Sequence, residues 1–182
     1  MEGWTEEEIK NKNLRAPCGI FCGACAIYIT TKDDNEKFRN MICGIWKTKP
    51  EDTKCFGCMQ PDPPQKLFVF CQNCVIRSCA KSKGFYSCHQ CEEWPCGTIE
   101  NSHLSDFIPS SIKKSVLRVI KRAIPLWRDK VAKHGDEMGS LEWTRAEAQR
   151  YHCPDCGKPL YRSAQQCRTC KKPVADELDG VI

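Results

Sequence analysis

Residues 153–170 read CPDCGKPLYRSAQQCRTC, which is two Cys-x-x-Cys pairs with ten residues between them. Two residues between thiolates is the span at which a tight turn directs both sulfurs at one ion, and two such turns complete a tetrahedral shell. Gly157 follows the first pair and suits the positive φ that such a turn tends to need, whereas Lys171 stands at the equivalent place after the second pair and must accept some strain. The stretch predicts a zinc ribbon, a closed structural site with Cys153, Cys156, Cys167 and Cys170 as ligands.

The same spacing recurs along the whole chain. Sixteen of the 182 residues are cysteine, and twelve of them form six Cys-x-x-Cys pairs, at 22/25, 55/58, 71/74, 88/91, 153/156 and 167/170. Neighbours that close seldom form an unstrained disulfide with each other, so the pairs favour metal coordination. The N-terminus has no signal-peptide pattern, and no segment approaches the roughly eighteen apolar residues that cross a bilayer. We therefore expect a cytoplasmic metal-binding protein with no membrane contact.

The formal charge of +5 counts the cysteines as neutral thiols. If all sixteen bind four divalent ions as thiolates, each site carries two net negative charges and the sum becomes −3. The remaining basic feature is local, since residues 108–133 contain eight lysines and arginines and a single acid, Asp129. The basic helix expected at 112–133 could contact a protein or a nucleic acid, although a solvated face that balances the thiolate charge is the favoured interpretation.

Composition divides the chain into a cysteine-rich domain at 1–100, a basic helical segment at 101–151 and the ribbon at 152–182. Apolar residues at three- and four-residue steps predict a helix over 112–131 that ends at Gly135. Pro125 inside this pattern predicts a kink, or two shorter helices that meet near 123–126. A second helix is expected over 141–151, with Ser140 as its N-cap.

In the first domain, Thr5 with Glu8 and Asp33 with Glu36 each form a capping-box pattern. The second opens a helix with Phe38, Met41, Ile42, Ile45 and Trp46 on its apolar face, and Cys43 beside that face is expected to be a core residue. Leu67–Phe70 is a short apolar run, either a strand or a buried turn. Together these features predict a small, metal-stabilised α+β fold with loop-rich cysteine knuckles, short helices, a helical middle and the ribbon.

Cys18, Cys22 and Cys25 form a C-x3-C-x2-C cluster, the spacing that holds the open iron–sulfur cluster of radical S-adenosylmethionine enzymes. Those enzymes need a large partial barrel, which this chain neither has the length for nor patterns. An internal repeat follows, because 71/74/79 and 88/91/96 share the spacing C-x2-C-x4-C with a displacement of seventeen residues. Three similar knuckles, counting the 55/58 pair, could be stacked.

The order of motifs is distinctive: Cys18-Gly-x-x-Cys22-x-x-Cys25 and Tyr28, Cys55-x-Gly-Cys58, Phe70-Cys71-x-x-Cys74-x-Ile76-Arg77-x-Cys79-Ala80, and Cys88-x-x-Cys91-x-x-x-Pro95-Cys96. It resembles the cysteine-rich family known as domain of unknown function 3795 (DUF3795), over about residues 14–100. The stretch at 139–143 is similar to the approach to a C-terminal ribbon in longer members. The resemblance implies metal binding, mostly in bacteria and archaea that live without oxygen. Cys43 is not part of this pattern.

Eleven candidate ligands precede the ribbon: Cys18, Cys22, Cys25, Cys55, Cys58, Cys71, Cys74, Cys79, Cys88, Cys91 and Cys96. One division places 55/58/71/74 in one closed site, 79/88/91/96 in another and 18/22/25 in a three-thiolate site whose fourth ligand is water, Cys43, a histidine or a substrate. Cross-braced divisions between the knuckles are equally allowed. Zinc is favoured over iron–sulfur here because the C-x2-C-x2-C-x3-C-P run of bacterial ferredoxins is absent.

The sequence shows no phosphate loop, catalytic triad order, paired catalytic carboxylates or dinucleotide fingerprint, so no catalytic residue is assigned. His89 is expected at the surface, and Tyr86, Trp94, Trp127 and Trp143 are expected in the core. The leading hypothesis is a multi-zinc protein with a structural or interaction role rather than an enzyme. The alternative is an iron–sulfur redox protein or enzyme with an open cluster at 18/22/25, and a third is thiol–disulfide exchange by metal-free pairs.

Overall fold

Helices and loops make up the described part of the chain, which in this computed structural model is residues 4–60, 67–100 and 110–174, with side chains from residue 114 in the last range. The helices are α1 Glu6–Lys10, η1 Lys12–Leu14, η2 Cys22–Ala24, α2 Ala26–Lys32, α3 Glu36–Trp46, α4 Val69–Gln72, α5 Val75–Ser82, η3 Cys88–Gln90, α6 Gly97–Glu100, α7 Ser110–His134 and α8 Asp136–Arg150. Within those ranges, β-pairing is limited to isolated bridges, two of them in the ribbon. The expected α+β class is therefore wrong, and the fold is mostly helical.

The apolar run at 67–70 explains part of this error. Leu67 and Phe68 are buried, but the run continues into α4 instead of pairing with a neighbour. Phe68 packs edge-on against Trp46 and Phe70, with ring centroids 5.5 and 5.2 Å away. A turn that buries aromatic side chains satisfies the same apolar pattern as a strand, so burial alone does not distinguish the two.

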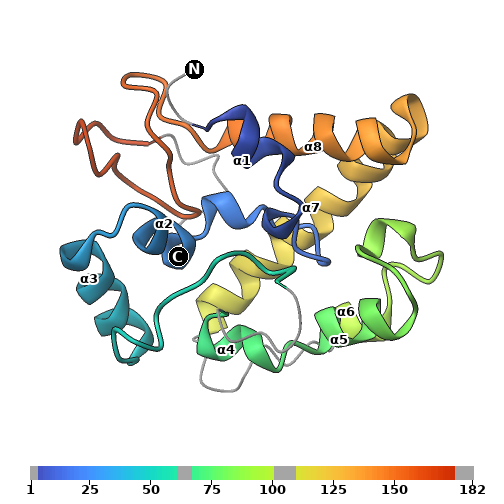
Figure 1. The fold of residues 1–182 in the computed structure, drawn as a ribbon, viewed down its shortest axis with the longest axis horizontal. Helices are drawn as coiled ribbons and strands as arrows, with labels where there is room; N and C mark the ends of the chain where they lie inside the picture. Colours follow the sequence, from blue (N-terminus) through green and yellow to red (C-terminus); the bar gives the residue numbers. More distant parts are fainter. Residues whose placement is uncertain (1–3, 61–66, 101–109, 175–182) are drawn as a thin grey trace.

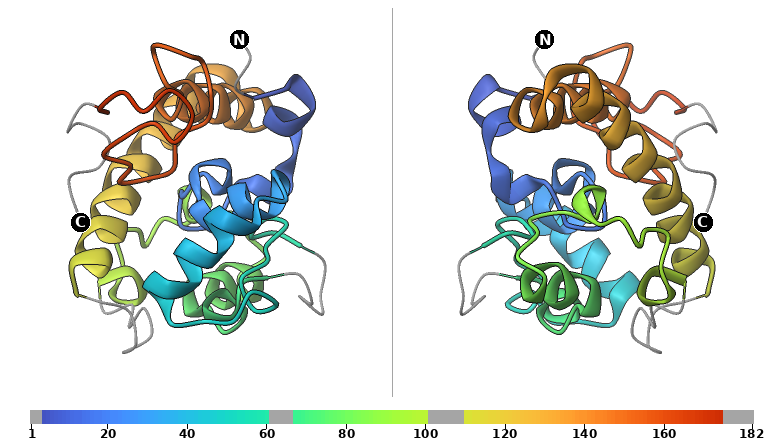
Figure 2. Two further views of the ribbon diagram at one scale, coloured as in Figure 1. Left: turned by 90° about the vertical axis from the view of Figure 1, so that its left-hand side faces the viewer. Right: turned by 90° about the vertical axis from the view of Figure 1, so that its right-hand side faces the viewer.

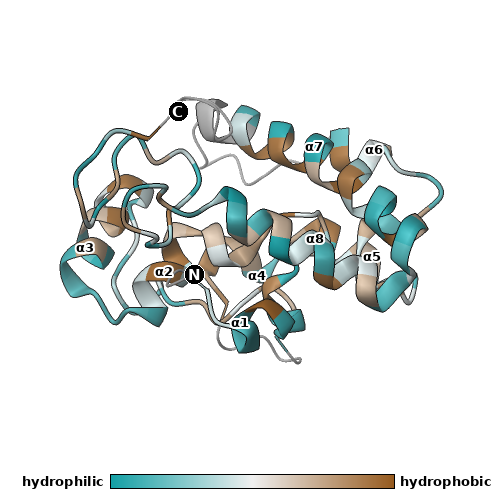
Figure 3. Cartoon of the chain, turned by 90° about the horizontal axis from the view of Figure 1, so that it is seen from above, coloured by the Kyte–Doolittle hydropathy of each residue, from teal (hydrophilic) through white to brown (hydrophobic). Residues whose placement is uncertain are grey.

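A long helical hairpin, α7 and α8, crosses one side of the molecule (Figure 1). α7 continues through Pro125 as one helix, so of the two expected alternatives the division into two helices is wrong, while the kink stays a prediction. Pro125 is exposed, and the carbonyl that it deprives of a partner belongs to Lys121, which is also exposed. Water can satisfy that carbonyl. Hydrophilic and hydrophobic bands alternate along α7 in Figure 3, as expected for a helix with one buried side.

The hairpin closes more tightly than the sequence indicated. Gly135 ends α7 as expected, with a φ of 76°, but α8 begins at Asp136 rather than after Ser140. The negative charges of Asp136 and Glu137 in its first turn interact favourably with the helix dipole. Gly139 lies at the crossing, where a Cβ atom would meet the Val131 Cα at 2.4 Å. The two helices can approach this closely only because residue 139 has no side chain.

The core runs from α1 to α8 through the cysteine-rich half. Trp127 stacks on Trp143 within it, with centroids 4.0 Å apart and planes 6° apart, and the burial of both rings confirms them as core residues. Figure 2 shows the hairpin curving around the N-terminal elements. Within the described ranges, no helix combines the length and apolarity required to cross a membrane.

Two helix starts test the capping patterns. The Thr5 and Glu8 capping box of α1 is present in full. At α3 the N-cap is Asn35, whose side chain accepts from the Phe38 N–H at 2.9 Å, so the Asp33 and Glu36 box is wrong. Phe38 and Ile42 face the core while Met41 and Ile45 are exposed, so the apolar face of α3 is narrower than expected.

Candidate metal centre

Four sulfurs meet at the C-terminus of the described chain. Cys153 Sγ lies 3.6 Å from Cys170 Sγ, and Cys156 Sγ lies 3.7 Å from Cys167 Sγ. All four ligand atoms lie within 4.8 Å of one another, and across residues 4–60, 67–100 and 110–174 no other set of three or more potential ligands is that compact. The four cysteines that the sequence selected for the ribbon are thus brought together as one candidate metal site.

The two knuckles have the same backbone construction. In the first, the Cys153 N–H donates to Lys158 O and the Gly157 N–H donates to Cys153 O, both at 2.8 Å. In the second, Cys167 and Lys171 repeat both hydrogen bonds at 2.9 Å. Gly157 and Lys171 have φ values of 69° and 64°, which confirms the predicted turn geometry and the strained lysine.

Hydrogen bonds within the knuckles favour thiolates. Burial raises the pKa of the Cys167 thiol, but the N–H groups of Cys170 and Thr169 outweigh it and lower the pKa to about 7. The Cys170 pKa is instead raised to about 12, because burial and the neighbouring thiols outweigh the N–H of Lys172. Four mutually repelling thiolates fit a divalent cation, which would offset their charge and hold all four deprotonated.

The ribbon is attached to the body of the protein by polar contacts. The Arg162 N–H donates to Ala24 O at 2.9 Å, and the Arg168 guanidinium pairs with Asp33. Its own small core contains Cys153, Leu160 and Cys167. Because this core is so small, the ribbon needs a metal ion or its contacts with α2 and α3 to hold its shape.

A second group of cysteines lines a small cavity of about 150 Å³ between α5 and η3. Its sulfur-bearing members are Cys79, Cys88, Cys91 and Cys96, which one of the divisions allowed by the sequence placed in one site. Burial, followed by the nearby Cys96 and Cys79 thiols, raises the pKa of Cys88 to about 12. The Lys83 ammonium at the rim lies 4.0 Å from Cys91 Sγ.

The remaining seven candidate ligands do not separate into the two groups that their spacing suggested. The Cys22 thiol pairs with that of Cys58, although the sequence suggested different sites for them. Burial raises the pKa of Cys55 to about 12, and the next largest contributions come from Cys22 and Cys25. Burial raises the pKa of Cys18, and the thiols of Cys74 and Cys22 raise it further. All seven belong to the main core or pack against it: Cys18, Cys22, Cys25, Cys55, Cys58, Cys71 and Cys74.

Two of the N-terminal knuckles share a local construction. A short 3-10 helix separates Cys22 from Cys25 and another separates Cys88 from Cys91, with the N–H of the later cysteine donating to the carbonyl of the earlier one at 2.9 and 3.2 Å. Gly57 has a φ of 107°, and a Cβ there would meet Asn13 O at 2.4 Å. This glycine therefore lets the 55/58 knuckle pack directly on η1.

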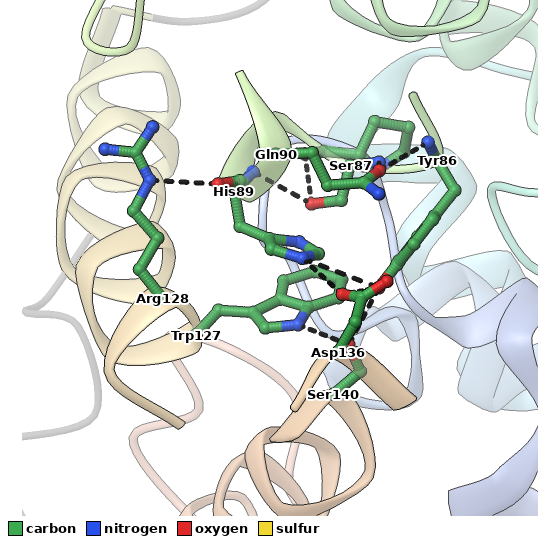
Figure 4. Close-up of polar contacts among 9 residues, drawn as sticks. Tyr86, Ser87, His89, Gln90, Trp127, Arg128, Asp136 and Ser140 are labelled. Atoms are coloured by element: carbon green, nitrogen blue, oxygen red, sulfur yellow. Dashed lines mark hydrogen bonds and ion pairs between the residues drawn. The ribbon is translucent and has the colours of Figure 1, made fainter. Parts of the chain in front are cut away.

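His89 in the third knuckle is buried, which contradicts the expectation of a surface residue. Its Nε2 lies 3.0 Å from Asp136 Oδ1, and its ring stacks on Trp127 with centroids 4.5 Å apart (Figure 4). Tyr86 OH donates to the same Asp136 oxygen at 2.7 Å, and Trp127 Nε1 donates to Ser140 Oγ at 2.8 Å. The sequence signal for this network was weak, since Asp136 and Ser140 are one helical turn apart but 47 or more positions from His89.

Cys43 is buried and its thiol donates to Thr53 Oγ1 at 3.2 Å, in agreement with a core role.

The basic helix is less available to an anionic partner than its composition suggests. Arg122 pairs with Glu147, and Arg128 donates to His89 O at 3.0 Å and also to Cys91 O.

Fold and geometry together define a mostly helical, cysteine-rich protein with a four-cysteine candidate metal site at its C-terminal end. Residues 14–101 match the model of the family described as protein of unknown function (DUF3795), which supports the resemblance over the N-terminal half. The ribbon lies outside the matched residues. No curated protein and no solved structure matches the chain.

Proposed function

We propose that this is a cytoplasmic multi-metal protein whose ribbon holds a structural zinc ion. The observation that carries the proposal is the convergence of the Cys153, Cys156, Cys167 and Cys170 sulfurs within 4.8 Å. A shell of four thiolates leaves no position open for substrate, so the role of the ion is to fold the ribbon. The function that follows is structural or interaction-based rather than catalytic.

We further propose that the eleven earlier cysteines bind zinc. Cys79, Cys88, Cys91 and Cys96 supply one tetrahedral shell around their shared cavity. The remaining seven supply two shells if one thiolate bridges two ions, because two tetrahedra that share a corner have seven ligands. This accounts for eleven ligands without an open site, and it is supported by the pairing of the Cys22 and Cys58 thiols.

The matched pair of variants Cys156→Ser and Cys43→Ser tests this function. Purified without oxygen, the protein is expected to be colourless and to contain about four zinc ions per chain. Cys156→Ser removes one ligand and should lose one ion, whereas Cys43→Ser should retain all of them because Cys43 is hydrogen-bonded to Thr53. A protein that holds no metal, or a Cys156→Ser variant with unchanged zinc, would contradict the proposal.

An iron–sulfur redox protein or enzyme is the second candidate, and the gathering of the buried Cys18 and Cys22 with the half-buried Cys25, Cys58 and Cys71 favours it. Such a centre gives a brown protein with visible charge-transfer absorption that Cys22→Ser abolishes. Under this candidate, protein purified without oxygen contains iron and sulfide in its N-terminal half in place of zinc. A spectrum that Cys22→Ser leaves unchanged would exclude this candidate.

A further inference from the structure

A cleft of about 1100 Å³ lies between the ribbon and the α2–α3 region. Figure 1 shows the orange and red loops of the ribbon beside these two helices. The Phe38 and Tyr161 rings meet across it with centroids 5.5 Å apart, and the Arg168 guanidinium covers Phe38 at 4.9 Å. The ion pair between Arg168 and Asp33 joins the two walls, so the cleft is a built feature of the fold.

The cleft is positively charged on both walls. Five cationic side chains line it against one carboxylate: Lys32, Lys37, Lys158, Arg168 and Lys171, with Asp33 as the acid. Asp33 is already neutralised by Arg168, and Lys32 is bound to Glu8 at 2.5 Å. Lys37 on one wall and Lys158 and Lys171 on the other are exposed. The positive charge of these three exposed lysines is larger than the two net negative charges of a zinc tetrathiolate in the ribbon.

Backbone strain marks the same cleft. Lys171 and Ser163 both line it, and both have positive φ values, 64° and 63°. The equivalent of Lys171 in the first knuckle is Gly157, which adopts this conformation without cost. A strained non-glycine residue at a binding surface suggests that its side chain has a use. At Lys171 that side chain adds a cation to the cleft.

We propose that this cleft binds single-stranded nucleic acid. Its volume exceeds the roughly 300–1,000 Å³ of a small-molecule pocket, so a polymer is the better fit. Lysines on opposite walls can contact successive phosphates, and the half-buried Tyr161 ring offers a surface on which a base can stack. Amide side chains at Asn35, Gln165 and Gln166 add hydrogen-bonding groups along the walls.

Fluorescence anisotropy with the full zinc-loaded chain and a labelled oligonucleotide of about twelve nucleotides tests this site. The variant Lys37→Gln/Lys158→Gln/Lys171→Gln should bind at least about tenfold more weakly. Its plot of log affinity against log salt concentration should be shallower by about 2, since each lost phosphate contact on a single strand removes about 0.7.

Lys47→Gln/Lys49→Gln/Lys54→Gln is the matched control, because it removes the same charge from exposed positions that do not line the cleft. Near-wild-type binding by this control supports the assignment. Equal losses in both triple variants, or no binding by the wild-type protein, would overturn it. Binding of duplex alone, or equally good competition by polyglutamate, would also overturn it.

The metal content of each variant separates this inference from the proposed function. None of the substituted lysines is a candidate metal ligand, so zinc should remain at the wild-type level. Lys37→Gln alone repeats the test without altering the ribbon and should weaken binding by about twofold or more. A protein that holds its zinc but binds no oligonucleotide would refute the cleft assignment and leave the metal sites standing.

Discussion

Loss of one partner of the ion pair between Arg122 of α7 and Glu147 of α8 should destabilise the helical hairpin. The two hydrogen bonds of this pair measure 2.6 and 2.9 Å, and Arg122 also donates to Tyr151 OH at 3.3 Å. The Glu147 side chain is 3% exposed and that of Arg122 is 24% exposed. Arg122→Leu therefore strands a buried carboxylate, a change that costs about 3–5 kcal/mol. Because water can reach the partly exposed arginine site, we expect about 3 kcal/mol.

Urea and thermal unfolding of the zinc-loaded protein measure this loss. At about 2–4 °C per kcal/mol for a chain of this size, Tm should fall by about 6–12 °C. Arg122→Leu/Glu147→Leu removes both charges and should recover most of the stability, which gives a favourable coupling in a double-mutant cycle. The reasoning is refuted if Arg122→Leu changes stability by less than about 0.5 kcal/mol, or if the double variant is as unstable as the two single losses combined.

Four other perturbations have defined outcomes. Gly139→Ala should lower the free energy of unfolding by about 1–3 kcal/mol, because the new Cβ meets the α7 backbone at 2.4 Å. Gly44→Ala on α3, where nothing lies within 4 Å of the added atom, should instead raise it by about 0.5–1 kcal/mol. Lys171→Gly should relieve about 1 kcal/mol of backbone strain, measured as slower zinc loss to a chelator, while it weakens oligonucleotide binding. Burial opposes ionisation of Asp136, but hydrogen bonds from Tyr86 and His89 lower its pKa below 3.8, so its contribution to stability is present above that pH and lost as pH falls through the folded pKa. Asp136→Asn should flatten this part of an acid-unfolding curve, and an unchanged curve would contradict the assignment.

Local chemistry made the four-cysteine cluster at 153–170 predictable from sequence. The spacing of its four cysteines was enough to predict that they converge, and the sequence also predicted the contrast between Gly157 and Lys171 at equivalent turn positions. The same applies to the Thr5 and Glu8 capping box, which involves residues three apart. Trp127 and Trp143 could be assigned to the core because large aromatic side chains rarely find another place in a small protein.

Long-range packing accounts for what the sequence did not reveal. Nothing near His89 indicates that Asp136 and Trp127 will enclose it, since both partners come from the distant hairpin. The start of α8 was misplaced because Ser140, a plausible N-cap, is used inside the helix as the acceptor for Trp127 Nε1. The pairing of the Cys22 thiol with the Cys58 thiol depends on how whole knuckles pack against one another, and the spacing within one knuckle does not determine that packing.

The hairpin joins both cysteine-rich ends of the molecule. Arg128 of α7 holds the backbone of the third knuckle through His89 O and Cys91 O, while Ser115 on the same helix lies 3.4 Å from Ser163 of the ribbon. Because one helix contacts both regions, we expect the loss of either contact to loosen the shared core. Removal of the metal proposed at the third knuckle should therefore loosen α7 as well as the knuckle, and the helices and proposed metal sites should unfold as one unit. Within this architecture the ribbon forms one wall of the basic cleft, so the proposed structural metal would also set the shape of the proposed nucleic-acid surface.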